Sequence, residues 1–309
     1  MGMMLGAKSV VVTAGWKYLD IDAYAGCIAY AELLRSVGVE ARAVSDAPVN
    51  WSVPKLVKDL GFVMESGGVT SEDKFVMVDL SDPEMFEKFV ELDRVVEVID
   101  HHTGFEEFWA ERIGEGAQIE FIGSVCTMIY EKYMEWGKVE LLDERMCKLM
   151  SAAILDNTLN LRAGVTTERD RGAYRELLEI GGLDENWAAE YFRACEDGVL
   201  TDLAGAIRDD VKYPGVEGLP EEVGQVVVFD HEKVLARADE LEGVFDGDSW
   251  MMNVISLKDG KSYVVAAEGL AVGISELLGG DVESEVLVLE KFMLRKEIVK
   301  RAQERVSNT

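Results

Sequence analysis

Short apolar runs of strand length alternate with helical patterns through the first half of the chain, and this rhythm constrains the fold most strongly. It predicts strands at residues 9–13, 39–44, 75–79 and 95–99, and helices at residues 23–37, 124–136 and 143–155. A repeated strand–helix–strand order favours a parallel sheet with helices on both faces. The first half therefore predicts a doubly wound, mainly parallel α/β domain.

The second half of the chain has a different pattern. Helical periodicity continues over residues 167–195, and strand-like runs then follow at 224–229, 250–257, 262–267 and 285–289. Between them, the small and charged residues Glu196-Asp197-Gly198 suggest a flexible linker. We expect a first domain over residues 1–195, a linker at 196–200 and a smaller mixed α/β domain over 201–309, with the active site in the cleft between the domains.

The charge of the chain restricts its partners. Acidic residues outnumber basic ones by 59 to 31, which gives a net charge of -28. Such a field repels the backbone of a long nucleic acid, so we do not expect that partner. A small phosphate-containing substrate remains compatible with a cleft that is locally basic or holds metal ions.

The cysteines and the apolar segments indicate the cellular compartment of the protein. Cys27, Cys126, Cys147 and Cys195 are scattered without a CxxC pair, which predicts reduced thiols. No stretch reaches the ~18 apolar residues of a membrane span, and the N-terminal residues lack a secretion-signal pattern. We therefore expect a cytoplasmic protein that does not enter a membrane.

Asp100-His101-His102 closes the predicted strand at 95–99 and contains two of the three histidines of the chain. In open α/β sheets, ligands bind in the crevice at the carboxyl ends of the strands. One carboxylate and two imidazoles form a borderline set of metal ligands. Taken alone, the triplet is equally compatible with an incidental surface turn.

Further carboxylates follow the other predicted elements. Asp20 and Asp22 come after the first strand, Asp79 ends the third, and Asp156 follows the helix at 143–155. Each aspartate alone also fits a turn or a helix cap. Several carboxylates in one partly dry crevice repel one another, and bound divalent cations remove that cost. The joint occurrence with the histidine pair favours a site for one or two metal ions that activates water for attack on phosphorus.

At these residues the sequence resembles the DHH phosphoesterase superfamily, which is known by these four acidic motifs in this order. Within it, the chain is similar to the family II, manganese-dependent inorganic pyrophosphatases. The resemblance extends over nearly the whole chain, through residues 122–127, 156–160, 166–170, 210–213, 223–226 and 294–297. It implies Mn²⁺ as the cofactor, with Mg²⁺ or Co²⁺ as alternatives, and a homodimer formed through an exposed sheet edge.

The resemblance also implies a set of metal ligands. Asp20 and Asp79 would hold one ion, and Asp22, Asp79, His101 and Asp156 would hold the other. Asp79 would bridge the two ions and is therefore also a catalytic residue.

Other residues would act on the substrate, again by resemblance. His102 would contact the substrate or a leaving-group oxygen, and Asp100 would orient its neighbours. In the second domain, Lys212, Arg295 and Lys296 would grip the phosphates.

The sequence departs from the pyrophosphatase pattern at its first motif. Trp16 stands where the family has a metal-binding histidine, and an indole ring offers no lone pair to a metal. Leu294 replaces the serine of the family's phosphate clamp. Two interpretations of Trp16 stay open: it fills the volume that the histidine vacates, or it forms a stacking platform for the base of a nucleotide substrate.

The sequence therefore predicts a metal-dependent hydrolase that cleaves a phosphoanhydride, either pyrophosphate or a short polyphosphate. One alternative is a phosphodiesterase or phosphatase acting on nucleotides or short oligonucleotides. A third hypothesis is a degenerate phosphate-ligand sensor without catalysis.

Overall fold

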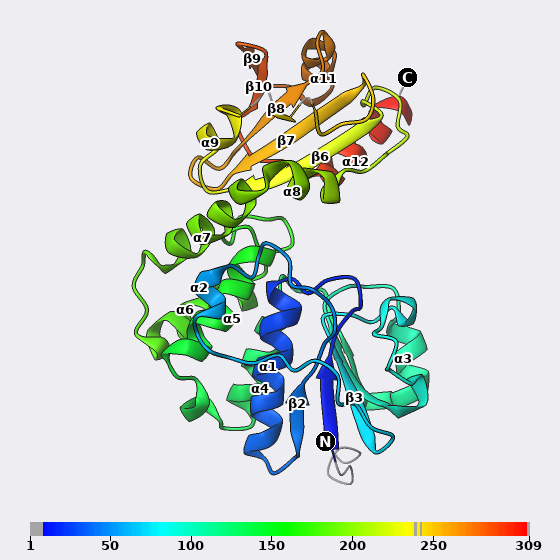
Figure 1. Cartoon of the computed structure of the whole chain (residues 1–309), viewed down its shortest axis with the longest axis vertical. Helices are drawn as coiled ribbons and strands as arrows, with labels where there is room; N and C mark the ends of the chain where they lie inside the picture. The colour runs from blue at the N-terminus through cyan, green and yellow to red at the C-terminus, as the bar shows by residue number, and fades with distance from the viewer. Residues whose placement is uncertain (1–8, 238–239, 242, 308–309) are drawn as a thin grey trace. The chain divides into compact units, whose positions relative to one another are not determined.

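The computed structural model describes residues 9–237, 240–241 and 243–307. Contacts within the chain divide it into two compact units, Met1–Tyr191 and Phe192–Thr309. Each unit is built on one five-stranded sheet (Figure 1).

The first unit contains a parallel sheet with the strand order β2-β1-β3-β4-β5. Its strands are β1 (Ser9–Thr13), β2 (Ala41–Ala43), β3 (Asp73–Val78), β4 (Val95–Asp100) and β5 (Ala117–Ile119). Every neighbouring pair is parallel, which confirms the predicted doubly wound domain. We did not predict β5, because its three half-buried residues give no apolar run.

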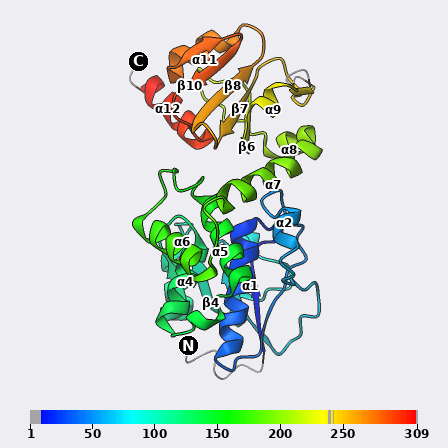
Figure 2. The same ribbon diagram turned by 90° about the vertical axis from the view of Figure 1, so that its left-hand side faces the viewer.

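Helices cover both faces of this sheet. One face carries α1 (Ile21–Ser36) and α4 (Val125–Glu135), against which α5 (Glu144–Asn157) packs, and the other carries α3 (Glu106–Ile113) (Figures 1 and 2). Small residues let α1 lie close to the sheet: a Cβ atom on Gly26 would lie 2.7 Å from Cγ1 of Val78. On the other face, the indole of Trp109 is fully buried beside Phe86.

The remaining helices of the first unit correct one prediction. They are α2 (Lys55–Lys58), α6 (Glu168–Gly181) and the start of α7 (Trp187–Thr201). Gly182 has a φ of 59° and ends α6, so the helical pattern at 167–195 is two helices. Residues 196–200, which we predicted as a flexible linker, lie inside α7. The composition of this segment therefore gave a wrong prediction. The carboxylate of Glu196 is buried and accepts hydrogen bonds from the backbone N–H of Asp230 and from Lys233, so this part of the chain is held in place.

The second unit is the predicted smaller mixed α/β domain. Its sheet has the order β6-β7-β8-β10-β9, in which only β6 and β7 are parallel. The strands are β6 (Glu222–Val228), β7 (Trp250–Ser256), β8 (Lys261–Ala266), β9 (Asp281–Glu283) and β10 (Val286–Leu289). The helices are α8 (Leu203–Asp210), α9 (Glu232–Leu235), α11 (Leu270–Leu278) and α12 (Arg295–Ser307).

Successive residues of β7 point to opposite faces of this sheet, so each face has its own core. Met252 packs with Leu203 and Ile207 of α8 on one face. Met251 packs with Ile274 of α11 and Ile298 of α12 on the other.

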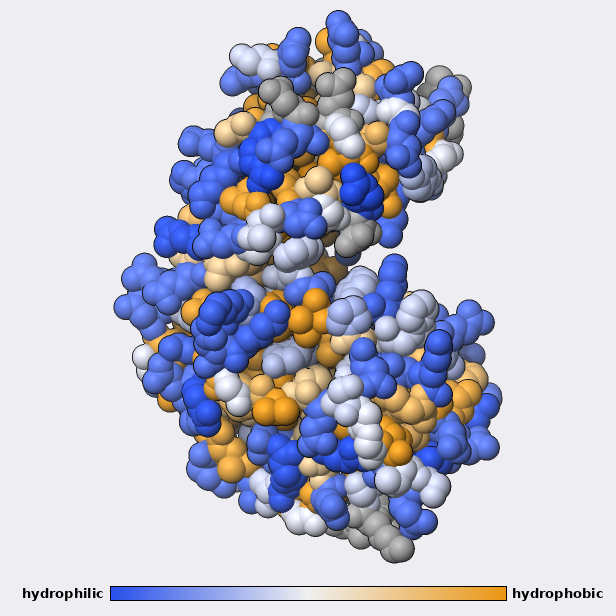
Figure 3. Space-filling model, in the orientation of Figure 1, coloured by the Kyte–Doolittle hydropathy of each residue, from blue (hydrophilic) through white to orange (hydrophobic). Residues whose placement is uncertain are grey.

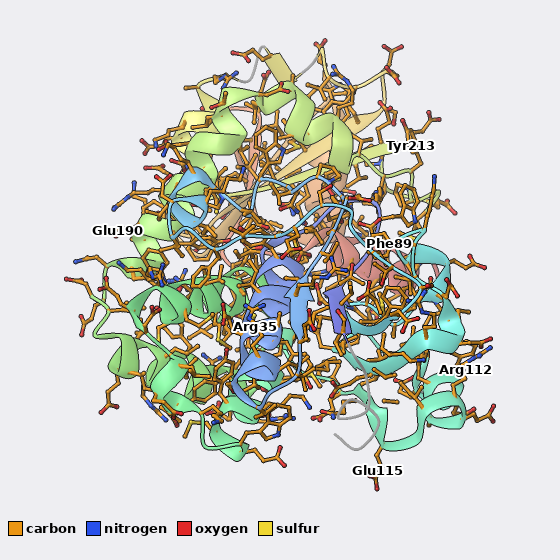
Figure 4. All side chains as sticks on the ribbon, turned by 60° about the horizontal axis from the view of Figure 1, so that its bottom comes forward. Arg35, Phe89, Arg112, Glu115, Glu190 and Tyr213 are labelled. Atoms are coloured by element: carbon orange, nitrogen blue, oxygen red, sulfur yellow. The ribbon has the colours of Figure 1, made fainter. Side chains whose placement is uncertain are left out.

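The surface is mostly hydrophilic, and hydrophobic residues form small scattered groups on the face shown in Figure 3. Charged side chains such as Arg112 and Glu115 project outward (Figure 4). All four cysteines are buried and unpaired. Among the described helices, none combines the length and the apolarity that crossing a bilayer would require.

Candidate metal centre

The strand order places the predicted ligands at one edge of the first sheet. β1 lies between β2 and β3 in the sheet. The connection after β1 leads to β2 on one side, and the connection after β2 returns to β3 on the other side. Such a reversal of the strand order leaves a crevice at the carboxyl ends of the strands. Asp20 lies in the loop between β1 and α1, and Asp79 directly follows β3. Asp100 is the last residue of β4, and His101 follows it.

Asp79 and His101 form the centre of this group. The backbone of Asp79 has a φ of 63°, and its N–H donates to the carbonyl of Ile99 at 2.9 Å. Oδ1 of Asp79 lies 3.1 Å from Nε2 of His101. Neither buried atom has a hydrogen-bond partner among the described residues. Two facing ligand atoms without partners fit a bound cation.

The other ring nitrogen of His101 is already engaged. Nδ1 of His101 lies 2.9 Å from the carbonyl oxygen of Ile122 and, as the donor in this contact, leaves the lone pair of the neutral ring on Nε2. A hydrogen bond from one ring nitrogen to a carbonyl oxygen orients a histidine for metal binding through the other.

The pKa values of these side chains also indicate a site for a cation. Burial raises the pKa of Asp79 to about 8, and the charges of Asp20 and Asp22 add to the rise. Burial also raises the pKa of Asp156 to about 7 and raises the pKa of Asp20. For His101, burial lowers the pKa, but the Asp79 carboxylate outweighs it and brings the value to about 10. The group therefore holds excess negative charge, which protons balance when no cation is bound.

Asp22 has an anchoring function that the sequence did not reveal. Its fully buried carboxylate accepts hydrogen bonds from Ser124 Oγ at 2.7 Å, Val125 N at 2.8 Å and Cys126 N at 3.1 Å, and also from the Asn157 amide. The carboxylate thus sits at the N-terminus of α4, where a negative charge is favourable. Oδ2 of Asp22 also lies 3.7 Å from Nε2 of His101, within the same group.

Asp20 is held by its own helix start, whereas Asp156 is held by a residue from another segment. Asp20 caps α1, with Oδ1 accepting from the backbone N–H groups of Asp22 and Ala23. The hydroxyl of Tyr191 lies 3.0 Å from Oδ1 of Asp156 and 2.9 Å from the carbonyl oxygen of Ser52.

His102 faces outward and is oriented by Asp100. The buried carboxylate of Asp100 accepts from the backbone N–H of His101 at 2.7 Å and lies 2.9 Å from Nδ1 of His102. The His102 side chain remains 63% exposed. The Asp100 hydrogen bond raises the pKa of His102 and fixes which ring nitrogen carries a proton.

The structure brings two of the predicted metal ligands, Asp79 and His101, together with His102. Asp79, His101 and His102 offer ligand atoms within 4.8 Å of one another, the one such group of His, Cys, Asp or Glu in the described part of the chain. Asp20 lies near enough to raise the pKa of Asp79, and Asp20 and Asp22 lie near enough to raise that of Asp156. Trp16 keeps 47% of its surface exposed.

Several supporting residues were not predicted. Tyr191 gave no local signal, because its contact with Asp156 spans 35 positions. Ser124 could have been found as a serine preceding a helical pattern. Asp170 is fully buried and accepts from the backbone N–H of Gly123 at 3.0 Å and from Thr127 Oγ1 at 2.7 Å. It thereby fixes the turn whose carbonyl group orients His101.

The three predicted phosphate-binding residues line one groove on the second unit. Lys212 is exposed, and its backbone pairs with Val223 in an antiparallel bridge. Arg295 opens α12 and forms a bidentate ion pair with Asp210 at 2.6 and 3.1 Å. Lys296 follows it and is exposed.

Comparisons with known proteins complete the description. A model of the DHH family, N-terminal domain, matches residues 10–154. A protein of Shouchella clausii (strain KSM-K16) is 30% identical over 235 residues, which cover 74% of each chain. A protein of an Exiguobacterium species (strain AT1b) is 28% identical over 275 residues, 87% of this chain and 85% of its own. Both are named probable manganese-dependent inorganic pyrophosphatase.

Two solved structures share the fold. A Methanococcus jannaschii protein described as a candidate family II inorganic pyrophosphatase has a TM-score of 0.64 and 20% identity, covering 95% of this chain and 99% of its own. An exopolyphosphatase-related protein of Bacteroides fragilis has a TM-score of 0.52 and 12% identity, covering 99% of this chain and 94% of its own.

Proposed function

This chain belongs to the DHH family, and we propose that it hydrolyses the phosphoanhydride bond of pyrophosphate or a short polyphosphate with bound divalent metal ions. The observation that carries the proposal is the pair of buried ligand atoms, Asp79 Oδ1 and His101 Nε2, which face each other at 3.1 Å and have no other hydrogen-bond partner among the described residues. The names of the sequence relatives make Mn²⁺ the expected ion, with Mg²⁺ or Co²⁺ as alternatives.

The donor set suits one or two such ions. We assign Asp20 and Asp79 to one ion and Asp22, Asp79, His101 and Asp156 to the other. When bound, divalent ions polarise phosphoryl oxygens and lower the pKa of water. The chain's own contribution is to hold these oxygen and nitrogen atoms in place, with hydrogen bonds that Tyr191 and the start of α4 donate and that the Ile122 carbonyl accepts.

His102 is the proposed proton donor to the leaving phosphate. Asp100 holds Nδ1, so Nε2 is the ring atom that is free to face a substrate oxygen. The raised pKa of His102 keeps more of the ring protonated near neutral pH, which suits a general acid. Lys212, Arg295 and Lys296 are the proposed phosphate-binding residues of the second unit.

Phosphate release tests the proposal directly. Pyrophosphate and tripolyphosphate are each incubated with the full chain and Mn²⁺, Mg²⁺ or Co²⁺, beside an Asp79→Asn variant. We expect metal-dependent turnover of at least one substrate, and its loss by a factor of roughly 10² or more in the variant. Retained metal binding with no turnover of either substrate would overturn the proposal and favour a phosphate sensor.

A second candidate substrate is a nucleotide, favoured by the 47% exposure of Trp16 in the loop that leads to Asp20. An exposed indole at this position can stack on a base. A Trp16→Ala variant would then lose nucleotide binding and keep metal binding. Unchanged nucleotide binding would exclude this candidate.

A further inference from the structure

The groove on the second unit is basic, whereas the chain as a whole is strongly acidic. It has a volume of about 630 Å³ and lies between the loop that follows α8 and the first turns of α12. Acidic residues make up 59 of the 309 positions, yet none of the ten lining residues is acidic. The polar side chains that face it include Lys212, Tyr213, Gln225, Arg295, Lys296 and Lys300. In so acidic a protein, a concave surface of this kind selects for an anion.

The cations of the groove differ in how they are balanced. Asp210 neutralises Arg295 through their bidentate contact, and Oε1 of Gln225 accepts from the Arg295 N–H at 2.6 Å. These bonds fix the start of α12. Lys212 and Lys296 have no carboxylate within ion-pair distance among the described side chains, so a ligand is their natural counter-charge. Tyr213 also lines the groove and is 68% exposed, with its side chain on the outside of the unit (Figure 4).

Lys300 extends this positive surface along the helix. It stands one turn beyond Lys296 on α12, which places its Cα about 6 Å further along the axis. Its Nζ lies 3.9 Å from Oε1 of Glu304, and both side chains are largely exposed. Such a pair contributes little and yields readily to a stronger anion. A pyrophosphate held at the start of α12 would leave Lys300 unused, whereas a longer phosphate chain would reach it.

We propose that this groove binds an inorganic phosphate chain longer than pyrophosphate, and that Lys300 determines the preference for chain length by contacting the phosphoryl groups beyond the first two. The inference rests on the proposed function, because it names the member of the phosphoanhydride class that the enzyme prefers. Each added phosphoryl group brings negative charge that the acidic surface repels and that a basic groove offsets.

A charge-matched pair of variants tests the role of Lys300. Lys300→Gln removes a cation inside the groove, and Lys291→Gln removes an exposed cation of the same unit outside it. We expect Lys300→Gln to lower the ratio of kcat/KM for tripolyphosphate to kcat/KM for pyrophosphate roughly two- to fivefold. Lys291→Gln should leave that ratio unchanged. Equal ratios in parent and Lys300→Gln would overturn the inference.

Binding without catalysis separates the inference from the proposed function. The full chain in a metal chelator is titrated calorimetrically with tripolyphosphate, at low and high salt. We expect binding that Lys300→Gln weakens and Lys291→Gln does not. Identical tripolyphosphate binding by the parent and Lys300→Gln, together with turnover of pyrophosphate, would remove the inference and leave the proposed function intact. Weakened binding in Lys300→Gln with no turnover of any phosphoanhydride would support the groove and refute the proposed function.

Discussion

In the metal-free protein, ionisation of Asp79 should lower the stability of the fold as the pH rises. Replacing Asp79 with asparagine should remove much of this dependence of stability on pH. The carboxylate is only 8% exposed and has a pKa of about 8, because burial and two neighbouring aspartates oppose its ionisation. In the unfolded chain the same group ionises near its ordinary value of 3.8. Between these two values the folded state binds one more proton than the unfolded state, so stability falls as the pH rises.

The size of the effect follows from the proton difference. One extra proton in the folded state costs about 1.4 kcal/mol for each unit of rising pH. From pH 6 to pH 8, Asp79 alone would therefore reduce the free energy of unfolding by about 2.5 kcal/mol. For a unit of this size, that corresponds to a fall in Tm of roughly 5–10 °C.

Thermal unfolding in the presence of a chelator measures this slope. The parent should lose Tm steadily from pH 6 to pH 8, and Asp79→Asn should be markedly flatter. Asp59→Asn makes the same chemical change on an aspartate at the exposed end of α2 and should follow the parent. Mn²⁺ should raise the parent's Tm more at pH 8 than at pH 6, since ligands must be deprotonated to bind it. Parallel slopes for the parent and Asp79→Asn would refute the electrostatic argument.

Three further substitutions test the supporting residues. Asp100→Asn should lower the pKa of His102, reduce kcat roughly 10- to 100-fold and move the alkaline limb of the pH–rate profile to lower pH; an unmoved limb would contradict the general-acid assignment. Tyr191→Phe should weaken Mn²⁺ binding roughly tenfold in a competition titration, because Asp156 loses the hydroxyl 3.0 Å from its Oδ1, and unchanged affinity would count against that assignment. Gly123→Ala should destabilise the fold by roughly 2–4 kcal/mol in denaturant titration, since the new Cβ would lie 2.7 Å from an oxygen of Asp170. Gly172→Ala is the matched control, a helical glycine with open space around it, and should stabilise by roughly 0.5–1 kcal/mol; equal effects of the two changes would exclude the steric explanation.

Most of the architecture could be predicted from the sequence because it depends on local patterns. The apolar runs of β1, β3, β4 and β7 are long enough to distinguish a buried strand, and each run ends near its predicted position. Polar residues at the carboxyl ends of parallel strands converge for topological reasons, so the amino-acid pattern alone was enough to place Asp79 and His101 together. The order of the four acidic motifs carried the resemblance to the DHH superfamily.

Patterns failed where an element was short or where a long-range contact outweighed composition. The three-residue strands β5 and β9 have no periodicity to detect. Residues 196–200 have the composition of a linker, yet the buried contacts of Glu196 keep α7 helical there.

The sequence by itself determined which chemical groups this protein has available: the aspartates, the histidine pair and the lysines at the start of α12. Only the tertiary structure decided how each group is held. Asp22 closes the N-terminus of α4, more than a hundred positions away, and Tyr191 reaches Asp156 from the first turns of α7. The physical reason is that a ligand's identity is a local property of the chain, whereas its pKa, orientation and hydrogen-bond partners depend on burial among segments that only folding brings together.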